Sequence, residues 1–542
     1  MKKIQIITLV LACGALLTGC KDYLTAPEPG VTRLEDFYIS GTAAVQNVTG
    51  CYVPLMWEFN ETYFSEWYIG DIVSDDALKG GQNVNDGADA YDMENWKTTA
   101  SNVILKDFYR AQYQGIGRCN LALKYIPDMA ADSVLTDRMR ARLLGEAHFL
   151  RAYYYFRLLR VFGGVPLTLT ELDNSAEWQM PRASVEGVFD QVLADLTEAQ
   201  KGLWEVSELP SSEIGRATKG AAEAMLMKTH LYMASPYWSR YITKSQPEDN
   251  YKAAKQWGDS VILGNQYALH ADYAGMFSEE GENGEESVFE IQYKAVPWGD
   301  FGSGNGFTAG SFTQRLVRSR STKQNLTLGD AGWGFNHPTQ NLYNEFEEGD
   351  VRREAAILIP TDDQMDDASD NSEEVYLGNR NLNNKYGWYG HELDHHARGP
   401  LNNKQIRYAD VLLMHAEACA ALGLDGEATT DLNQVRTARN MPTYPGYTYS
   451  TTTPDAGSDL LNAIRHERRV ELAMEAHRWF DLVRWYGGEG NGLDTYMNVT
   501  YPATETEAAC GHMAKFIAGK NEIFPIPAEE IELNHMEQNP KY

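Results

Sequence analysis

Apolar residues recur along this chain at helical spacings, and the clearest run lies near the C-terminus. Residues 461–485 contain neither Gly nor Pro and are rich in strong helix formers, which predicts one long helix. Its apolar stripe ends at Trp479 and Val483 and is expected to face a core. Basic and acidic residues stand three apart beside this stripe: Arg468–Glu471, Glu475–Arg478 and Arg478–Asp481. Because an Arg partner keeps a carboxylate ionised, we interpret them as a structural ion-pair network and not as a catalytic pair.

Further helical segments come in pairs. The pattern predicts helices over residues 103–126, 138–161, 185–203, 217–234, 251–263, 407–422 and 427–439. Where these segments follow one another without interruption, their starts lie about 34 residues apart, which is the tetratricopeptide period. The sequence therefore predicts a mainly α fold, a tetratricopeptide-like helical-repeat scaffold.

One long stretch interrupts the repeats. Helical periodicity is lost from about residue 271 to 399, apart from a strand-like run over 287–295. Irregular stretches of this length are usually binding regions or disordered, and the many aromatic residues here argue against disorder. We therefore expect an N-terminal helical region (41–270), a large irregular, aromatic-rich ligand-binding lobe (271–400) and a C-terminal helical region (401–542).

The N-terminus has the pattern of a bacterial lipoprotein signal. Lys2 and Lys3 precede an apolar run over residues 4–17, which ends in a Leu-Thr-Gly-Cys sequence. This pattern predicts a signal peptide over 1–19 and lipidation of Cys20, followed by a tether over 20–40. The lipid would anchor the mature chain in a membrane.

Charge and cysteine content exclude several classes of function. The formal net charge of the 542 residues is −29, so nucleic acid is not expected as a partner. The cysteines beyond Cys20 show no C-x-x-C spacing, so no zinc site is predicted, and Cys119 and Cys419 are expected to be buried in helices. Disulfide pairing stays open.

Residues 71–92 are rich in Asp and Asn, and we favour a solvated acidic loop over a calcium site.

Residues 391–395 match the H-E-x-x-H pattern of zinc metalloproteases, with His391 and His395 as ligands. That chemistry requires a buried helix, whereas glycines precede the motif, Gly399 and Pro400 follow it, and few apolar residues are available to bury it. We interpret the motif as a polar loop, and a metal-dependent hydrolase stays a remote alternative.

The remaining candidate chemistry is aromatic. No convincing nucleophile, base or cofactor motif is present, so we expect a binding protein without enzymatic activity, cofactor or metal. The chain contains 31 Tyr, 18 Phe and 12 Trp. Sugar rings stack on exposed aromatic rings and are oriented by polar side chains. The candidate ligand-binding residues are the aromatic Trp67, Trp96, Trp298, Trp333, Trp388 and Tyr389, with Asp75 and Asn383 as polar partners.

Several blocks resemble signature segments of the SusD/RagB family. They are residues 142–167, 215–222, 407–422, the ERRVEL and HRWFDLVRW segments of 461–485, and Phe524-Pro525-Ile526-Pro527 with the residues that follow. With the lipoprotein signal they extend over nearly the whole chain. The resemblance implies a SusD-like outer-membrane lipoprotein that captures an oligosaccharide and delivers it to a SusC-like, TonB-dependent transporter.

The resemblance leaves two questions open. Lys21 and Asp22 partly match a signal for surface export, although Tyr23 replaces a second acidic residue, and we expect the protein to face the cell exterior. Some members of the family handle peptides, so an oligopeptide receptor stays an alternative.

Overall fold

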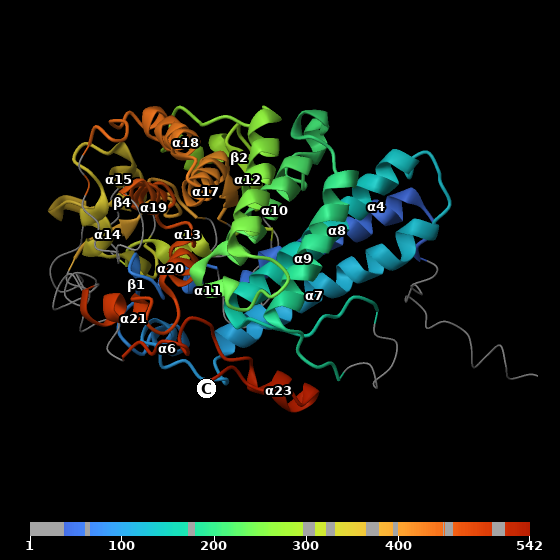
Figure 1. Cartoon of the computed structure of the whole chain (residues 1–542), viewed down its shortest axis with the longest axis horizontal. Coiled ribbons are helices and arrows are strands. Elements are labelled where there is room, and N and C mark those ends of the chain that lie inside the picture. The colour runs from blue at the N-terminus through green and yellow to red at the C-terminus, as the bar shows by residue number, and fades with distance from the viewer. Residues whose placement is uncertain are drawn as a thin grey trace, which may run out of the picture.

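The computed structural model describes residues 37–59, 66–171, 179–295, 309–320, 331–364, 379–393, 399–447, 449, 459–500 and 515–542. The predictions for Cys20, Trp298 and His395 fall outside these residues. Within them, the fold is mainly helical, with three two-stranded sheets (Figure 1). No helix in these ranges is long and apolar enough to cross a bilayer.

The long helices form one curved array. It runs through α4 (Gly41–Tyr52), α7 (Val103–Tyr125), α8 (Asp137–Phe162), α9 (Val185–Gly202), α10 (Lys219–Ala234), α12 (Pro247–Leu263), α17 (Tyr408–Ala421) and α18 (Asp425–Ala438). From α7 onward each of these helices packs on the next, which is the arrangement of a helical-repeat scaffold. The predicted helix pairs are confirmed to within four residues at each end.

Local sequence explains where these helices begin and how closely they pack. Side chains of Asn102, Thr136, Ser184 and Thr218 cap α7 to α10 by accepting hydrogen bonds from backbone N–H groups in the first turn. At the α7–α8 crossing, a Cβ on Gly115 would lie 2.2 Å from the ring of Tyr154, so only glycine permits this approach.

The cysteines of the described ranges contribute to this packing. Cys51, Cys119 and Cys419 are free and buried, which confirms the prediction for Cys119 and Cys419.

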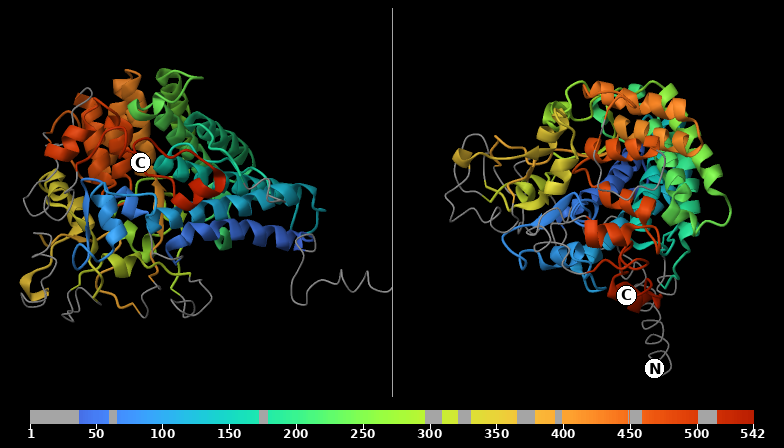
Figure 2. Two further views of the ribbon diagram at one scale, coloured as in Figure 1. Left: turned by 90° about the horizontal axis from the view of Figure 1, so that it is seen from below. Right: turned by 60° about the vertical axis from the view of Figure 1, so that its left-hand side comes forward.

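The irregular region lies at the end of the molecule opposite α4 and α7 (Figures 1 and 2). Its described residues form β2 (Ser287–Ile291), α13 (Thr313–Val317), β3 (Phe335–Pro338), α14 (Gln340–Glu345), α15 (Val351–Ala356), β4 (Ile357–Leu358) and β5 (Leu382–Asn383). The predicted strand is confirmed over its first five residues. The short helices were not predicted, because five or six residues are too few to establish a helical period.

Strand pairing joins this region to distant parts of the chain. Strand β1 (Ala77–Gly80) pairs with β3, and β6 (Asn403–Arg407) pairs with β2, both antiparallel. The third sheet, β4 with β5, is local. The irregular region is therefore connected to both helical regions through backbone hydrogen bonds.

The predicted single helix over 461–485 is wrong. The structure has two helices, α19 (Asp459–Glu471) and α20 (Arg478–Tyr486), with Met474 and Ala476 between them in the left-handed region at φ 63° and 62°. The backbone oxygen of Glu471 accepts hydrogen bonds from the Tyr273 hydroxyl (2.6 Å), from Arg407 (3.0 Å) and from Lys385 (3.2 Å). These donors replace the intrahelical bond that would continue the helix.

A network of buried ion pairs surrounds this break. We call it the Glu471 network: the Glu471 carboxylate contacts Arg352 (2.9 Å), Arg407 (3.0 Å) and Arg439 (2.9 Å), and the last two also pair with Glu286. An ion-pair network is therefore confirmed. The Glu471 side chain bridges to other segments of the chain, whereas the pair of Arg484 with Asp481 (2.8 Å) lies along α20. Burial alone would raise the pKa of Glu471, but the three arginines hold it well below its usual range.

The acidic segment after residue 70 is largely buried, so the solvated-loop interpretation is wrong for its first part. Asp71, Asp75 and Asp76 are at most 1% exposed. Arg478 lies 2.7 Å from Asp75, and Arg469 lies 2.9 Å from Asp76. Burial raises the pKa of Asp71 to about 8, whereas Asp75 stays ionised despite its burial because Arg469 and Arg478 lower its pKa. Within the segment, residues 82–85, 87 and 88 are exposed.

The apolar stripe of α19 and α20 is buried as predicted. Trp479 is 1% exposed and packs edge-on against Phe516, with ring centroids 6.0 Å apart. We expect Trp479→Ala to lower the free energy of unfolding by about 3–5 kcal/mol, because the cavity cannot close fully. Urea unfolding measures this loss. Leu263→Ala, at a residue that is 81% exposed, is the control and should have little effect. A similar loss in both variants would contradict the expectation.

Removing one charge from the Glu471 network should destabilise the whole fold. Glu471→Gln leaves three guanidinium groups short of one negative charge, and breaking a buried pair of this kind costs about 3–5 kcal/mol. Thermal and urea unfolding measure the change. Glu198→Gln, which removes an exposed pair with Lys201, should change stability by less than about 1 kcal/mol. An unchanged midpoint for Glu471→Gln would show that the network does not stabilise the fold.

The same network should make stability depend on pH in the acid range. Burial opposes ionisation of Glu475, but Arg407 and Lys385 lower its pKa to about 2. The pKa in the unfolded chain is about 4.3, so this contribution is complete above that pH and is lost as the pH falls toward about 2. Thermal midpoints of the wild type should therefore fall over this window. Glu475→Gln should show a shallower fall, and an identical slope would contradict the assignment.

Candidate ligand-binding site

Four of the predicted site residues meet around α13 and the residues that flank it. The Trp67 indole donates a long hydrogen bond to Thr313 (3.4 Å), and the Tyr389 hydroxyl donates one to the Val317 carbonyl (3.5 Å). Trp333 packs edge-on against Phe312, with centroids 5.1 Å apart, and Trp388 lies next to Arg318. Trp67 and Tyr389, which lie 322 positions apart in the sequence, thus both contact one short helix.

Arg318 holds Trp388 from the side of α13. Its guanidinium donates to the backbone oxygens of Gly387 (2.7 Å) and Trp388 (2.5 Å), and its side chain is fully buried. Trp388 itself has φ 48°, a left-handed conformation that is strained for a large side chain. Strained residues persist where the surroundings determine their conformation, and they cluster at functional sites.

A tight turn leads into Trp388. Asn383 at the end of β5 accepts a hydrogen bond from the backbone N–H of Tyr386 (3.2 Å) through its side-chain oxygen. Within this turn, the buried Lys385 pairs with Glu475 (2.6 Å) and thus joins the turn to the Glu471 network. The position of Trp388 therefore depends on the central ion pairs.

The exposure of the four aromatic residues differs. Trp67 is only 3% exposed and stacks on Tyr68, so it belongs to the core. Trp333, Trp388 and Tyr389 are half-buried. The exposed His391 ring lies parallel to the Trp388 indole, with centroids 4.3 Å apart and 5° between the planes. The His391 ring therefore lies against the Trp388 indole in the geometry that a stacked sugar ring would adopt.

The other predicted site residues lie in different surroundings. Asp75 is fully buried in ion pairs with Arg478 and Arg469. Trp96 is 5% exposed and packs against Phe516, and Asn383 is 1% exposed. The contacts that the structure gives these three side chains lie within the fold. Their direct contact with a ligand stays a prediction.

The H-E-x-x-H motif is described only over its first three residues. His391, Glu392 and Leu393 lie outside any helix, and the first two are exposed. A zinc protease site would require one buried helical turn between its two histidines. The described half of the motif agrees with the loop interpretation.

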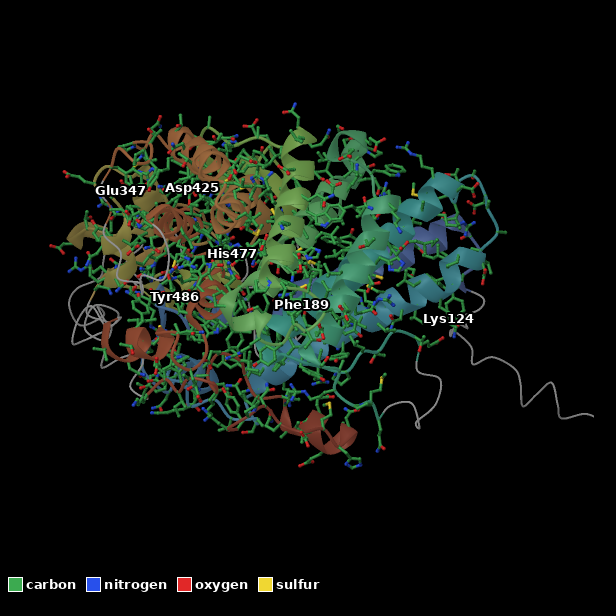
Figure 3. All side chains as sticks on the ribbon, viewed as in Figure 1. Lys124, Phe189, Glu347, Asp425, His477 and Tyr486 are labelled. Carbon is green, nitrogen blue, oxygen red and sulfur yellow. The ribbon has the colours of Figure 1, made fainter. Side chains whose placement is uncertain are left out.

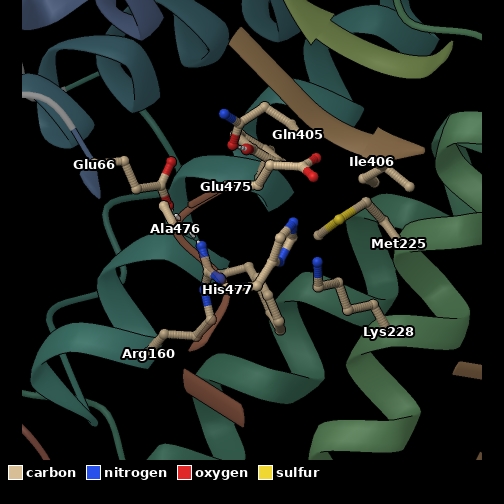
Figure 4. Close-up of a pocket in the computed structure, with 11 residues that line it drawn as sticks. Glu66, Arg160, Met225, Lys228, Gln405, Ile406, Glu475, Ala476 and His477 are labelled. Atoms are coloured by element: carbon tan, nitrogen blue, oxygen red, sulfur yellow. Dashed lines mark hydrogen bonds and ion pairs between the residues drawn. The ribbon is translucent and has the colours of Figure 1, made fainter. Parts of the chain in front are cut away.

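A small cavity lies beside the helix break (Figure 4), at His477 near the middle of the molecule (Figure 3). It is lined by Glu475, Ala476 and His477 from the break and by Met225 and Lys228 from α10, among others. Its free volume is about 10 Å³, which is room for about one water and not for a sugar. Burial, with Lys228 nearby, lowers the pKa of His477 to about 3, so its ring is neutral.

A larger open pocket lies on another face, between α7 and α23 (Ala528–Asn534). Its volume is about 380 Å³, and Tyr109, Tyr113, Arg110 and Glu530 are among its lining residues. The two tyrosine rings lie 4.7 Å apart, and the Tyr113 hydroxyl donates to the Pro166 carbonyl (2.7 Å). This pocket was not predicted from the sequence, because its residues come from segments that read only as helix and loop.

Arg318 and Lys385 were also missed by the sequence analysis. Both are basic residues in irregular segments, and no local pattern distinguishes them from solvated charges. Their roles follow from burial, because a buried charge requires a partner.

Comparison with known proteins agrees with this arrangement. A model described as the SusD family matches residues 271–542, and a second, described as "Starch-binding associating with outer membrane", matches residues 35–231. The first match alone spans half of the chain. The chain belongs to the SusD/RagB family.

Individual relatives of this family match along most of their length. SusD-like protein P38 of Formosa agariphila is 27% identical over 516 residues, which cover 89% of this chain and 91% of that protein. Starch-binding protein SusD of Bacteroides thetaiotaomicron is 23% identical over 468 residues, covering 75% of this chain and 74% of that protein.

A solved structure, of a laminarin-binding SusD-like protein, has a TM-score of 0.73 at 25% identity and covers 93% of this chain and 100% of that one. The family resemblance and the mainly α scaffold predicted from the sequence are confirmed.

Proposed function

We propose that this SusD/RagB-family protein is a non-enzymatic outer-membrane lipoprotein that binds an oligosaccharide and delivers it to a SusC-like, TonB-dependent transporter. Family membership is the observation that carries the proposal. The relatives named for starch and laminarin binding support a glycan as the class of ligand. The description of the second family match supports association with the outer membrane. Lipidation at Cys20 would supply the anchor, and the partial export signal at Lys21 and Asp22 supports a position facing the cell exterior.

Within the molecule, we place the ligand at Trp388. Its indole is half-exposed, and its backbone is fixed by Arg318. The ring of His391 already stacks against the indole. Stacking on a rigid indole suits the flat C–H face of a sugar, because little conformational entropy is lost on binding. Trp333 and Tyr389 lie around the same helix and would extend the aromatic surface for further sugar units.

A peptide ligand is the alternative within the family. A peptide would be recognised mainly through hydrogen bonds to its backbone, as when a strand is added to a sheet edge. The half-exposed aromatic residues around α13 favour the glycan, since they offer ring faces.

The glycan proposal predicts a specific loss of affinity. Trp388→Ala should weaken binding of the best ligand in a panel of soluble polysaccharides by at least about 30-fold, since a central aromatic anchor contributes about 2 kcal/mol or more. Isothermal titration calorimetry measures the affinity. The matched control is Trp257→Ala on α12, which removes another half-buried indole and should leave binding unchanged.

Other outcomes would change the proposal. If Tyr113→Ala loses glycan binding while Trp388→Ala binds fully, the ligand site would be assigned to the pocket between α7 and α23. Binding of peptide mixtures and of no polysaccharide would favour the oligopeptide receptor. Stoichiometric zinc that is lost in His391→Ala would favour the hydrolase. Failure of the lipidated protein to co-purify with a SusC-like transporter would contradict delivery to such a partner.

A further inference from the structure

The open pocket between α7 and α23 has the size and the lining of a ligand site. Its volume is about 380 Å³, within the range of about 300–1,000 Å³ that is usual for small-molecule sites. None of the described residues that line it belongs to the surroundings of Trp388. We propose that this pocket is a second, weaker carbohydrate site that binds neutral sugar units. The class of ligand rests on the proposed function, whereas the place of binding goes beyond it.

Part of the pocket lining is apolar and aromatic. Tyr109 and Tyr113 stand one helical turn apart on α7, and Pro166 and Met180 also line the pocket. The Tyr113 hydroxyl donates to the Pro166 carbonyl (2.7 Å), which holds the half-buried ring in place. A fixed ring can accept the C–H face of a sugar with little loss of conformational entropy. Because Tyr109 is only 3% exposed, one ring does most of this work, and we expect weaker binding here than at Trp388.

Helix α23 contributes an oriented carboxyl group to the same pocket. Glu530 and Asn534 stand one turn apart on α23 and both line the pocket. The Asn534 amide donates to Oε2 of Glu530 (3.3 Å) and accepts from the backbone N–H of Met180 (3.2 Å), so it is fixed on both sides. Oε1 of the half-buried Glu530 has no hydrogen-bond partner among the residues that the structure describes. Asn534 therefore holds a carboxyl group that has one oxygen left for the hydroxyl of a ligand.

The charges of the pocket balance, which favours a neutral ligand. Arg110 and Glu530 are the two charged residues among the described residues that line it. Burial and the neighbouring Glu529 raise the pKa of Glu530, and Arg110 opposes this rise. A phosphate or carboxylate ligand would be repelled by Glu530, and an amine would be repelled by Arg110. A sugar hydroxyl can donate to the carboxylate and accept from the guanidinium, so it suits both.

An amide side chain adds hydrogen-bonding capacity on the solvent side. Gln114 lines the pocket one residue after Tyr113, is exposed, and has no hydrogen-bond partner in the described part of the chain. Its amide offers both donors and an acceptor to a sugar hydroxyl. A glycan that reaches both this pocket and Trp388 would bind more tightly than a short oligosaccharide, because the second contact becomes intramolecular.

Calorimetric titration of the full-length protein with neutral hexasaccharides tests this proposal. The probes are malto-, laminari-, cello-, xylo- and mannohexaose. For the probe that binds, we expect two sites of unequal affinity in the wild type. Trp388→Ala should keep the weaker site, Glu530→Ala should keep the stronger one, and the double variant should bind no probe. Glu530→Ala should weaken its own site at least about 10-fold, because a charged hydrogen-bond acceptor is removed.

A matched variant and the pattern of losses separate the two sites. Glu532→Ala removes an exposed carboxylate of α23 that does not line the pocket, and it should keep both sites. Circular dichroism checks that each variant is folded. A single wild-type site that is lost in Trp388→Ala and kept in Glu530→Ala would overturn the second site alone. A single site with the reverse pattern would support the pocket and overturn the placement at Trp388. Binding of none of the probes would overturn the pocket proposal.

Discussion

A buried carboxylate cannot remain ionised without compensating charge, and Glu471 is the residue on which this constraint acts most strongly. It lies in the interior with no exposed side-chain surface and is contacted by three guanidinium groups from three other segments. Arg352 comes from α15, Arg407 from the end of β6 and Arg439 from the end of α18. Because each charge is stabilised only when its partners are in place, these segments have to assemble together.

The same constraint determines the local backbone. The Glu471 carbonyl is occupied by donors from Tyr273, Arg407 and Lys385, and the helix ends there. Lys385 in turn positions the turn that presents Trp388, and Arg318 holds the backbone of that residue through a hydrogen bond. The proposed ligand platform is therefore an extension of the central ion pairs into an irregular surface region.

Much of the scaffold was predictable from the chain. The long helices from α7 to α18 follow from apolar periodicity and N-terminal capping residues, both of which are local properties. The break between α19 and α20 was not predictable, because residues 461–485 have high helix propensity throughout and tertiary hydrogen bonds override it. At the site, aromatic composition singled out Trp333, Trp388 and Tyr389. The same criterion also selected Trp67 and Trp96, which are almost fully buried.

The sequence by itself determined the helical scaffold, the SusD/RagB family and the kind of side chains that a glycan receptor would use. Only the tertiary structure decided which charges are paired and which aromatic rings reach the surface. The physical reason is that periodicity and capping depend on neighbours a few residues away. Burial and ion pairing depend on residues such as Arg469 and Asp76, which lie 393 positions apart. Exposure of Trp388 is likewise set by Arg318 and Lys385, from segments with no regular pattern.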